Sequence, residues 1–455
     1  MILVKLRDFV TLSPSVTSWL NLAAKSLGML ALIPLVNSNF SELDRFFWFT
    51  LTTSWSLVLL LDVGLNATVT RYFSYLNSVD NLSNIIPNNL PLNALDVKSL
   101  TILITRFYYG AMIFVVLLIF PAIFFSIYEK IVDSPSFFEY ILLMIATSGV
   151  SLLYLLSNAF NGITQGLGYL PKVQLLQLVT TVISLLAAST AIFFTENISI
   201  TVACFYTPFA FYFFVIKRTA YQKMGVRFSN SGNKNFNKIR QLIRKRLFHD
   251  TCKSGVGILS SQGYIIGTTM LINKTESIDI AIKYMICMQV IRAISSFSQV
   301  PFYSRIPVFC QQYALKKYSE LGIDLTRRFS VSIFLFIAMV IVFGVSVKTE
   351  FGDLIFGSQL EPKLWLAFGC TFLCERIGAL LMQVYTITGD IKWHIINSGG
   401  GILGMSILFV MPMSLNVFSI LGSIFFSYLV FVIPYISFYI AKEPSLEFPS
   451  LIINR

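Results

Sequence analysis

The chain has 455 residues, of which 55% are hydrophobic, 15% aromatic and only 12% charged, and its net charge is +12. A soluble domain has about 25% charged residues, so this composition excludes a soluble enzyme, a nucleic-acid-binding protein and a disordered scaffold. Because a membrane-spanning helix needs about 20 apolar residues, the composition predicts an all-α polytopic membrane protein.

Twelve apolar runs of spanning length follow one another along the chain, with a basic stretch between the sixth and the seventh. The runs lie at about 15–36, 46–66, 106–127, 137–160, 173–194 and 198–216, and then at about 254–272, 285–306, 329–347, 363–386, 393–413 and 417–440. This order predicts two six-helix lobes in a 6+6 arrangement, an N-terminal lobe at 1–216 and a C-terminal lobe with a short cytoplasmic tail at 254–455. A basic cytoplasmic linker at 217–253 joins them, and we expect a central cavity.

The positions of the cationic residues predict the orientation of the chain. With the N and C termini both cytoplasmic, most of the 34 Lys and Arg residues lie on the cytoplasmic side, as the positive-inside rule requires. The same distribution explains the net charge, so we expect no nucleic-acid partner. The outer loops are short, the longest at about 348–362, which leaves no room for an outer catalytic domain. We therefore expect a transporter and not an enzyme.

Metal and cofactor chemistry has few candidate ligands in this sequence. The six cysteines form no CxxC pair, and the two histidines, His249 and His394, are far apart in the chain. Structural zinc sites use closely spaced Cys and His ligands, so we expect no metal site and no cofactor. Cys370 and Cys374 lie one helical turn apart in an apolar run, where cysteine usually packs as a small hydrophobic residue.

Five ionisable residues fall inside the predicted spans. They are Lys25, Asp62, Arg292, Glu375 and Arg376. A charge at bilayer depth costs about 2.5–3.5 kcal/mol on insertion scales, so each must face a partner or water. Structural ion pairs between helices are one explanation. Three cations face only two acids, however, and this excess favours a water-filled cationic cavity.

Amide side chains share helical faces with these charges and extend the predicted polar lining. At helical spacing, one stripe carries Asn21 with Lys25, another carries Gln289 and Gln299 with Arg292, and Gln383 lies two turns after Arg376. A further stripe consists of Asn158, Asn161 and Gln165. A lipid-facing helix would avoid such stripes, whereas hydrogen bonds between helices would also explain them.

Two local motifs resemble those of a known family. They are LLLDVGLNATVTRYF at 59–73 and NGITQGLGYLPK at 161–172. The place that corresponds to the second motif after the tenth run reads MQVYTITGDIKW at 382–393, and it shares only the glycine Gly389 with Gly168. With the twelve runs and the basic central loop, these motifs resemble the multidrug/oligosaccharidyl-lipid/polysaccharide (MOP) flippase superfamily. Within it, the chain is similar to the polysaccharide-biosynthesis branch, the Wzx-type O-antigen flippases.

The resemblance implies a V-shaped bundle that works by alternating access. The implied cargo is an undecaprenyl-pyrophosphate-linked oligosaccharide, such as an O-antigen repeat unit, moved from the cytoplasmic to the outer leaflet of the bacterial inner membrane for lipopolysaccharide or related polysaccharide biosynthesis. The cavity cations of the family map by position onto Lys25, Arg292 and Arg376. Glu375 and Asp62 are candidates for coupling to H⁺ or Na⁺. Expected partners are membrane lipid, a polysaccharide polymerase and a chain-length regulator.

Two other functions compete with this interpretation. A MATE-like exporter of drugs or organic cations would favour an acidic or aromatic pocket, and the excess of buried cations argues against it. An integral-membrane O-antigen polymerase or glycosyltransferase would need a large outer loop with catalytic residues, which this sequence lacks. A scaffold without transport does not explain why charges lie at bilayer depth.

Overall fold

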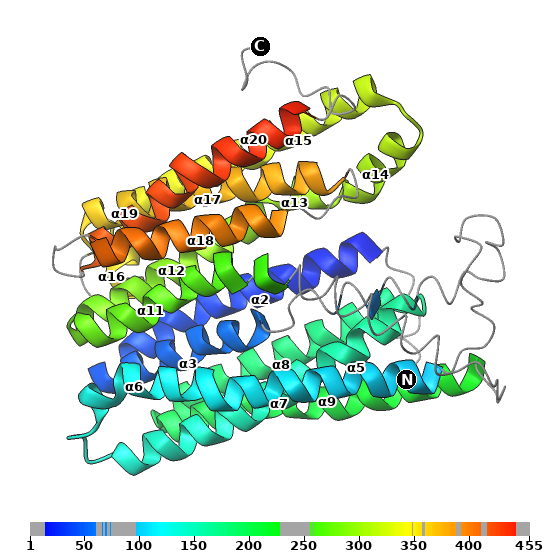
Figure 1. Ribbon diagram of the computed structural model, residues 1–455. Coiled ribbons are helices and arrows are strands. Elements are labelled where there is room, and N and C mark those ends of the chain that lie inside the picture. The colour runs from blue at the N-terminus through cyan, green and yellow to red at the C-terminus, as the bar shows by residue number, and fades with distance from the viewer. Residues whose placement is uncertain are drawn as a thin grey trace. The chain divides into compact units, whose positions relative to one another are not determined.

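The structure, a computed structural model, describes most of the chain. The described residues are 14–60, 66, 69–70, 73, 97–227, 255–257, 259–347, 349–356, 360–387, 393–410 and 416–442. Within this part of the chain every secondary-structure element is an α-helix or a short π-helical stretch (Figure 1). The predicted all-α class is therefore confirmed.

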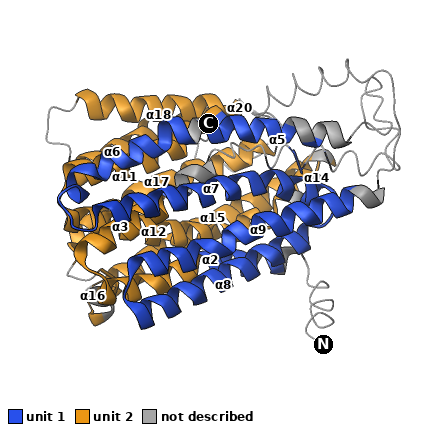
Figure 2. Ribbon diagram, turned by 90° about the horizontal axis from the view of Figure 1, so that it is seen from below, with its two compact units in different colours: residues 1–25, 54–255 blue, residues 26–53, 256–455 orange. Residues whose placement is uncertain are grey.

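The chain divides into two compact units, each made of two segments (Figure 2). Unit 1 comprises residues 1–25 and 54–255, and unit 2 comprises residues 26–53 and 256–455. This division differs from the lobes expected from the sequence in placing residues 26–53 with the C-terminal half. The 6+6 arrangement itself stays a prediction.

Unit 1 is a bundle of long helices centred on α7. Its elements are the start of α2 (Pro14–Asn39), the end of α3 (Glu42–Leu60), α5 (Val97–Phe114), η2 (Val115–Ile119), α6 (Phe120–Ile131), α7 (Phe137–Gly166), α8 (Leu170–Thr195) and α9 (Ile198–Arg227). α7 packs against α5, α8 and α9, and α8 lies beside α9. The π-helical stretch η2 directly precedes Pro121, whose ring cannot donate a backbone hydrogen bond.

The turn between α7 and α8 depends on a glycine. Gly168 has a φ of 90°, a left-handed conformation that residues with a Cβ rarely adopt. Its amide donates to the carbonyl of Gln165 at 2.9 Å, and Pro171 stands in the first turn of α8. A glycine that ends one helix and a proline that starts the next form the tight reversal needed between two long antiparallel helices.

Unit 2 is built around α17 (Pro362–Thr386). Its other elements after residue 255 are η3 (Leu259–Gly263), α11 (Tyr264–Thr275), α12 (Ile278–Ser298), α13 (Val300–Tyr303), α14 (Ile306–Ala314), α15 (Tyr318–Ser346), α16 (Glu350–Phe356), α18 (Trp393–Val410), α19 (Val417–Phe426), η4 (Ser427–Val432) and α20 (Ile433–Lys442). α17 packs against α12, α15, α19 and α20. This central position explains why its charged residues are buried.

The α18 helix packs through glycines instead of side chains. A Cβ on Gly399 would contact the ring of Phe431, and a Cβ on Gly400 would contact Val432. A Cβ on Gly401 would contact the backbone carbonyl of Ser260 in η3. This glycine face therefore lets the helix approach both η3 and η4 at backbone distance.

Helix boundaries differ from the expected ones where polar turns extend the apolar runs. α9 continues to Arg227, so residues 217–227 of the expected linker are helical, and residues 228–254 lie outside the described residues. α15 begins at Tyr318, before the expected run. In this added part of the helix, Asp324 Oδ1 lies 3.6 Å from Arg328 Nε, one turn later. Such pairs stabilise helix that projects beyond the hydrocarbon core. The short helix α16 occupies the expected outer loop.

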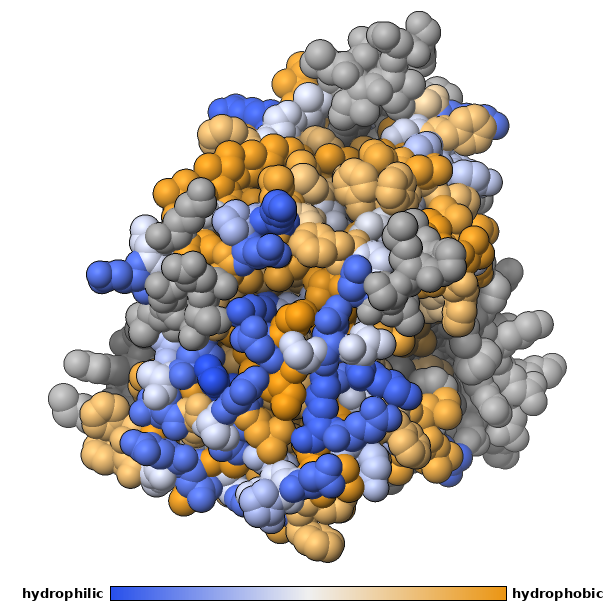
Figure 3. All heavy atoms as spheres, turned by 90° about the vertical axis from the view of Figure 1, so that its left-hand side faces the viewer, coloured by the Kyte–Doolittle hydropathy of each residue, from blue (hydrophilic) through white to orange (hydrophobic). Residues whose placement is uncertain are grey.

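Nine stretches of the described residues are long and apolar enough to cross a membrane. One of them, Phe137–Thr195, contains both α7 and α8. Large apolar side chains such as Phe194 and Phe409 are 78% and 90% exposed, as expected for surfaces that face lipid. Figure 3 shows one face of the molecule, on which hydrophilic side chains gather beside strongly apolar ones. The chain is a multi-pass membrane protein.

Candidate functional site

The candidate cation Lys25 lies in unit 1 beside a group of amides. On α2, Asn21 donates from Nδ2 to the Oε1 atoms of Gln174 and Gln177 on α8, at 2.6 and 2.9 Å. One turn along α2, the Lys25 ammonium donates to the same Gln177 oxygen at 3.4 Å. Asn21 and Lys25 act together because residues four apart are neighbours on a helix. No carboxylate among the described residues lies within ion-pair distance of Lys25.

The amide group continues through a tyrosine to α7. The Tyr212 hydroxyl on α9 interacts with Gln177 and donates to Asn161 Oδ1 at 2.5 Å. The Asn161 amide nitrogen in turn donates to Asn158 Oδ1 at 3.1 Å. Three of the predicted lining residues, Asn21, Asn158 and Asn161, therefore belong to one hydrogen-bonded chain that joins α2, α8, α9 and α7. We call this chain, with Lys25, the amide network.

An aromatic cluster adjoins the amide network. The Trp55 ring is 5.3 Å from Tyr154, 4.9 Å from Tyr206 and 5.4 Å from Phe209, measured between ring centroids. Tyr154 also lies 5.9 Å from Tyr212, which belongs to the amide network. Trp55 is half-buried, whereas the other members of the cluster are buried. Unit 1 thus combines neutral hydrogen-bonding groups with a large aromatic surface.

In unit 2, Arg376 is held at a break between two helices. α12 ends at Ser298 and α13 begins at Val300, because Pro301 lacks the backbone N–H that a continuous helix would use. At this break the Gln299 side chain accepts a hydrogen bond from Arg376 Nη1 at 2.7 Å, and the Ser295 carbonyl accepts one at 3.4 Å. Arg376 is 6% exposed.

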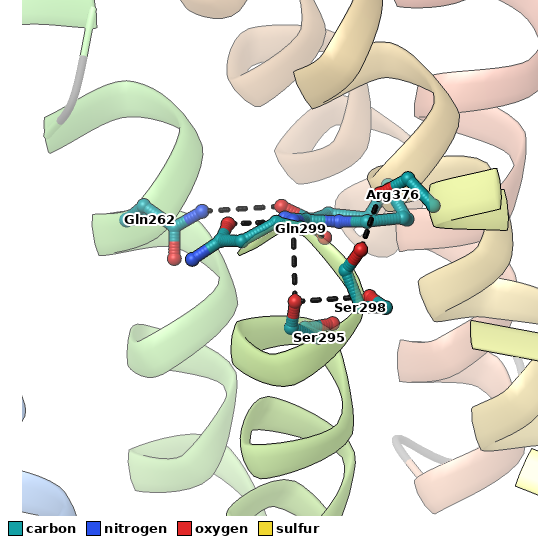
Figure 4. A network of polar contacts seen from close by, with 7 residues as sticks. Gln262, Ser295, Ser298, Gln299 and Arg376 are labelled. Carbon is teal, nitrogen blue, oxygen red and sulfur yellow. Dashed lines mark hydrogen bonds and ion pairs between the residues drawn. The ribbon is translucent and has the colours of Figure 1, made fainter. Parts of the chain in front are cut away.

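The acid beside Arg376 completes a buried ion pair. Glu375 is 5% exposed, and its Oε2 lies 3.7 Å from Arg376 Nη2. Adjacent helix residues point about 100° apart, but the long arginine side chain bridges the difference. Gln262 donates from Nε2 to Glu375 Oε1 at 3.4 Å, and Tyr303 interacts with Arg376 and with Gln383. Figure 4 shows these contacts, with Gln262, Gln299 and Arg376 labelled and the hydrogen bonds dashed.

Arg292 differs from Arg376 because no acid among the described residues pairs with it. Its Nη2 is buried and has no hydrogen-bond partner in the part of the chain that the structure describes. The Glu375 carboxylate and the Tyr284 hydroxyl are near enough to interact electrostatically with it, but neither forms an ion pair or hydrogen bond with it. We call Arg292, Arg376, Glu375, Gln262 and Gln299 the charged network.

Two predicted lining residues have other contacts, and one predicted site residue is not described. Gln289, one turn before Arg292 on α12, donates from Nε2 to Thr52 Oγ1 at 3.0 Å. Gln165 is half-buried near the end of α7, and its backbone carbonyl takes part in the Gly168 turn. Asp62 lies outside the described residues, so its role stays a prediction.

The sequence analysis missed several members of the two networks and of the aromatic cluster. They are Trp55, Gln174, Gln177, Tyr212 and Gln262. Gln174 and Gln177 are three residues apart in the fifth apolar run, a spacing that places both on one helix face and could have revealed them. No comparable signal marked the other three.

An apolar cavity of about 630 Å³ lies between α8 and α9. Its lining is almost entirely aliphatic and aromatic, and it includes Ile183, Cys204, Pro208 and Phe211. Tyr212 belongs both to this lining and to the amide network. This one side chain therefore connects an apolar surface to the polar interior of unit 1.

The polar groups of the two networks can bind oxygen-rich ligands. Their donors are amide, hydroxyl, ammonium and guanidinium groups, which suit hydroxyl and phosphate oxygens. Among the described residues, no group of three or more His, Cys, Asp or Glu side chains is placed to hold a metal ion.

Comparison with known proteins identifies the fold. No family model and no curated protein sequence matches the chain. Among solved structures, it resembles an outward-facing multidrug resistance MATE family transporter of the MOP superfamily, with a TM-score of 0.61 and 12% identity over 95% of this chain and 97% of the transporter.

Two further solved structures share this likeness. A MOP superfamily transporter from Pyrococcus furiosus, in which reverse polarity of the binding pocket suggests a different function, has a TM-score of 0.59 and 13% identity over 95% of this chain and 97% of the other. The lipid II flippase MurJ, in an inward closed conformation, has a TM-score of 0.59 and 11% identity over 95% of this chain and 88% of the flippase. The chain therefore has the fold of MOP superfamily transporters.

Proposed function

We propose that this protein is a flippase that moves an undecaprenyl-pyrophosphate-linked oligosaccharide, such as an O-antigen repeat unit, across the bacterial inner membrane. The observation that carries the proposal is the state of Lys25 and Arg292. Both lie within apolar spans, and neither forms an ion pair with a carboxylate of the described residues. Uncompensated cations at this depth are costly, and an anionic cargo supplies the missing charge.

The pyrophosphate of the cargo matches the arginines of unit 2. A guanidinium group can donate two parallel hydrogen bonds to phosphate oxygens, whereas an ammonium group acts as a point charge. Arg292 has a buried Nη2 with no hydrogen-bond partner among the residues that the structure describes, and this donor is available for such an oxygen. Arg376 is engaged by Glu375 and Gln299, and it would exchange these contacts for phosphate.

Transport in this proposal uses twelve spans in two six-helix lobes and alternating access. The described helices support part of this count, because nine described stretches qualify as spans, one of them, Phe137–Thr195, contains both α7 and α8, and α18 contains the shorter apolar helix His394–Val410. Glycines on α18 and the break before Pro301 suit helices that move against one another. Glu375 is the proposed coupling group, since protonation would remove its charge and release Arg376.

The fold alone is also compatible with an exporter of drugs or organic cations, because a multidrug MATE transporter shares it. That cargo is cationic and would be repelled by Lys25 and Arg292. Among the solved structures of this fold, one transporter has a reversed pocket polarity that suggests a different function, and another is a flippase for lipid II. Cationic residues in this chain favour the lipid-linked cargo over the drug.

The decisive experiment is complementation of a flippase-null strain. Wild-type protein should restore the ladder of surface polysaccharide, and the Arg292→Ala and Arg376→Ala double variant should not, at equal abundance in the membrane. A normal ladder from the double variant would exclude the cationic route. Export of a cationic dye by cells that express the protein, with no change in polysaccharide, would favour the exporter instead.

The proposed orientation is tested separately by cysteine labelling. With both termini cytoplasmic, single cysteines introduced in the basic stretch 217–253 should react with a membrane-impermeant reagent only after the cells are opened. Labelling of intact cells at these positions would invert the topology and contradict the direction of transport.

A further inference from the structure

The amide network and the aromatic cluster of unit 1 have a chemistry that pyrophosphate does not require. Trp55, Tyr154, Tyr206 and Phe209 form a continuous aromatic surface with ring centroids 4.9–5.4 Å apart. An aromatic face packs well against the C–H face of a sugar ring, because both are flat and weakly polar. Trp55 is only half-buried, so part of this surface remains accessible.

Hydrogen-bonding groups of both kinds lie directly beside these rings. Tyr212 contacts Tyr154 and donates to Asn161, which donates to Asn158. An amide is both a donor and an acceptor, and so is a hydroxyl. A sugar hydroxyl has the same double character, so this set can bind several hydroxyls of one ring in either sense.

Among the buried polar atoms of unit 1 that have no hydrogen-bond partner in the described part of the chain, two lie in or beside the aromatic cluster and the amide network. The Tyr206 hydroxyl is on a side chain that is 2% exposed and has no hydrogen-bond partner among the described residues. The same holds for Oδ1 of Asn21, on a side chain that is 5% exposed. Buried polar atoms are normally hydrogen-bonded, so these two point to a polyhydroxylated ligand.

None of these side chains carries a charge, which separates them from the charged network. We propose that Trp55, Tyr206, Asn158 and Asn161 of unit 1 form the subsite for the sugar part of the cargo, distinct from the residues that bind its pyrophosphate. This inference rests on the proposed function and adds a division of labour to it, in which these uncharged side chains select the glycan.

Binding to purified protein in nanodiscs tests the division with two lipids. One is bare undecaprenyl pyrophosphate, and the other is the undecaprenyl-pyrophosphate-linked repeat unit extracted from a polymerase-deficient strain. Trp55→Leu should weaken binding of the glycolipid by about tenfold, the effect of losing one large aromatic contact. The same variant should leave the affinity for the bare lipid unchanged.

Two further variants guard against misfolding of the Trp55 variant. Asn158→Ala removes a half-buried amide and should weaken only glycolipid binding, and Tyr206→Phe should do the same to a smaller extent. The matched control is Tyr284→Phe in unit 2, which removes a hydroxyl bonded to Thr268 at 2.8 Å and should leave the preference for the glycolipid intact.

The possible failures of this experiment are distinct. Equal affinity of the wild type for both lipids, or equal losses for both in the Trp55 and Asn158 variants, would overturn the sugar subsite and leave the flippase proposal standing. Absence of binding of either lipid to the wild type would overturn both. Weaker binding of the glycolipid alone in the unit 1 variants, and of both lipids in Arg292→Gln, would establish the division.

Discussion

The amide network of unit 1 and the charged network of unit 2 both hold polar side chains inside apolar spans, but they contain different groups. The amide network consists of neutral amides around a single ammonium group, and the charged network contains two guanidinium groups and one carboxylate. Neutral groups can satisfy one another at modest cost. Buried ions need a specific partner, and loss of one leaves the other uncompensated. Substitutions in unit 2 should therefore have larger effects than substitutions in unit 1.

The largest effect is expected for Arg376→Ala. This change leaves Glu375 buried without its ion-pair partner, and breaking a buried pair in this way costs about 3–5 kcal/mol. We expect a lower melting temperature in detergent, with the variant still inserted in the membrane. The double variant Glu375→Gln with Arg376→Gln removes both charges and should recover the melting temperature but not transport. Recovery of transport as well would show that the pair is structural only.

Arg292→Gln should abolish transport with little loss of stability. No carboxylate of the described residues pairs with Arg292, so its removal leaves no acid unpaired. Loss of one charge-assisted contact to phosphate is worth about 1.5–3 kcal/mol, roughly ten- to a hundredfold in affinity. Binding of bare undecaprenyl pyrophosphate measures this loss. The control is Lys283→Gln, which removes an exposed pair with Asp279 on the same helix and should leave binding unchanged.

Lys25→Gln should have an intermediate effect. The substituted amide can still hydrogen-bond to Gln177, so the amide network stays intact and only the charge is lost. We expect polysaccharide display to fall about tenfold, because water in the site would weaken the attraction between the Lys25 charge and the anionic cargo. Unchanged display at normal expression would remove Lys25 from the cargo route.

The smallest effects concern two glycines, one in each unit. A Cβ on Gly401 would meet the Ser260 carbonyl in unit 2, and a Cβ on Gly162 would lie 2.8 Å from Asn66 Oδ1 in unit 1. Overpacking of this kind costs about 1–3 kcal/mol, and thermal melting measures it. Gly401→Ala should also reduce transport, since displacement of η3 would move Gln262, which donates a hydrogen bond to Glu375. Gly162→Ala should leave lipid binding by unit 2 unchanged.

Much of the fold follows from hydropathy alone, because an apolar run of spanning length has few alternatives to a helix in lipid. Each of the twelve expected runs contains helix in the described part of the chain. The residues at which the helices begin and end were less predictable. The Asp324–Arg328 pair extends α15, and the apolar pattern carries no information about such polar turns.

The site was predictable to the extent that it follows helical spacing. Asn158 and Asn161, three residues apart on one helix, are hydrogen-bonded to each other, and Asn21 and Lys25, four residues apart, both donate to Gln177. Contacts between distant helices were not predictable. Nothing in the sequence near Gln262 indicates that it reaches Glu375, or that Arg292 lacks an acid while Arg376 has one. These depend on how side chains from separate helices meet.

The interruption between α12 and α13 gives Arg376 a second task. Its guanidinium group donates to the Gln299 side chain and to the Ser295 carbonyl, which also accepts from the Gln299 amide at 3.2 Å and from Ser298 Oγ at 3.0 Å. Arg376 therefore stabilises the last turn of α12 at the break. Its withdrawal toward an arriving phosphate would remove both contacts and loosen the joint at Gln299. Cargo binding would then be coupled to bending of the helix at this break. A Pro301→Ala variant should bind the cargo but fail to release it.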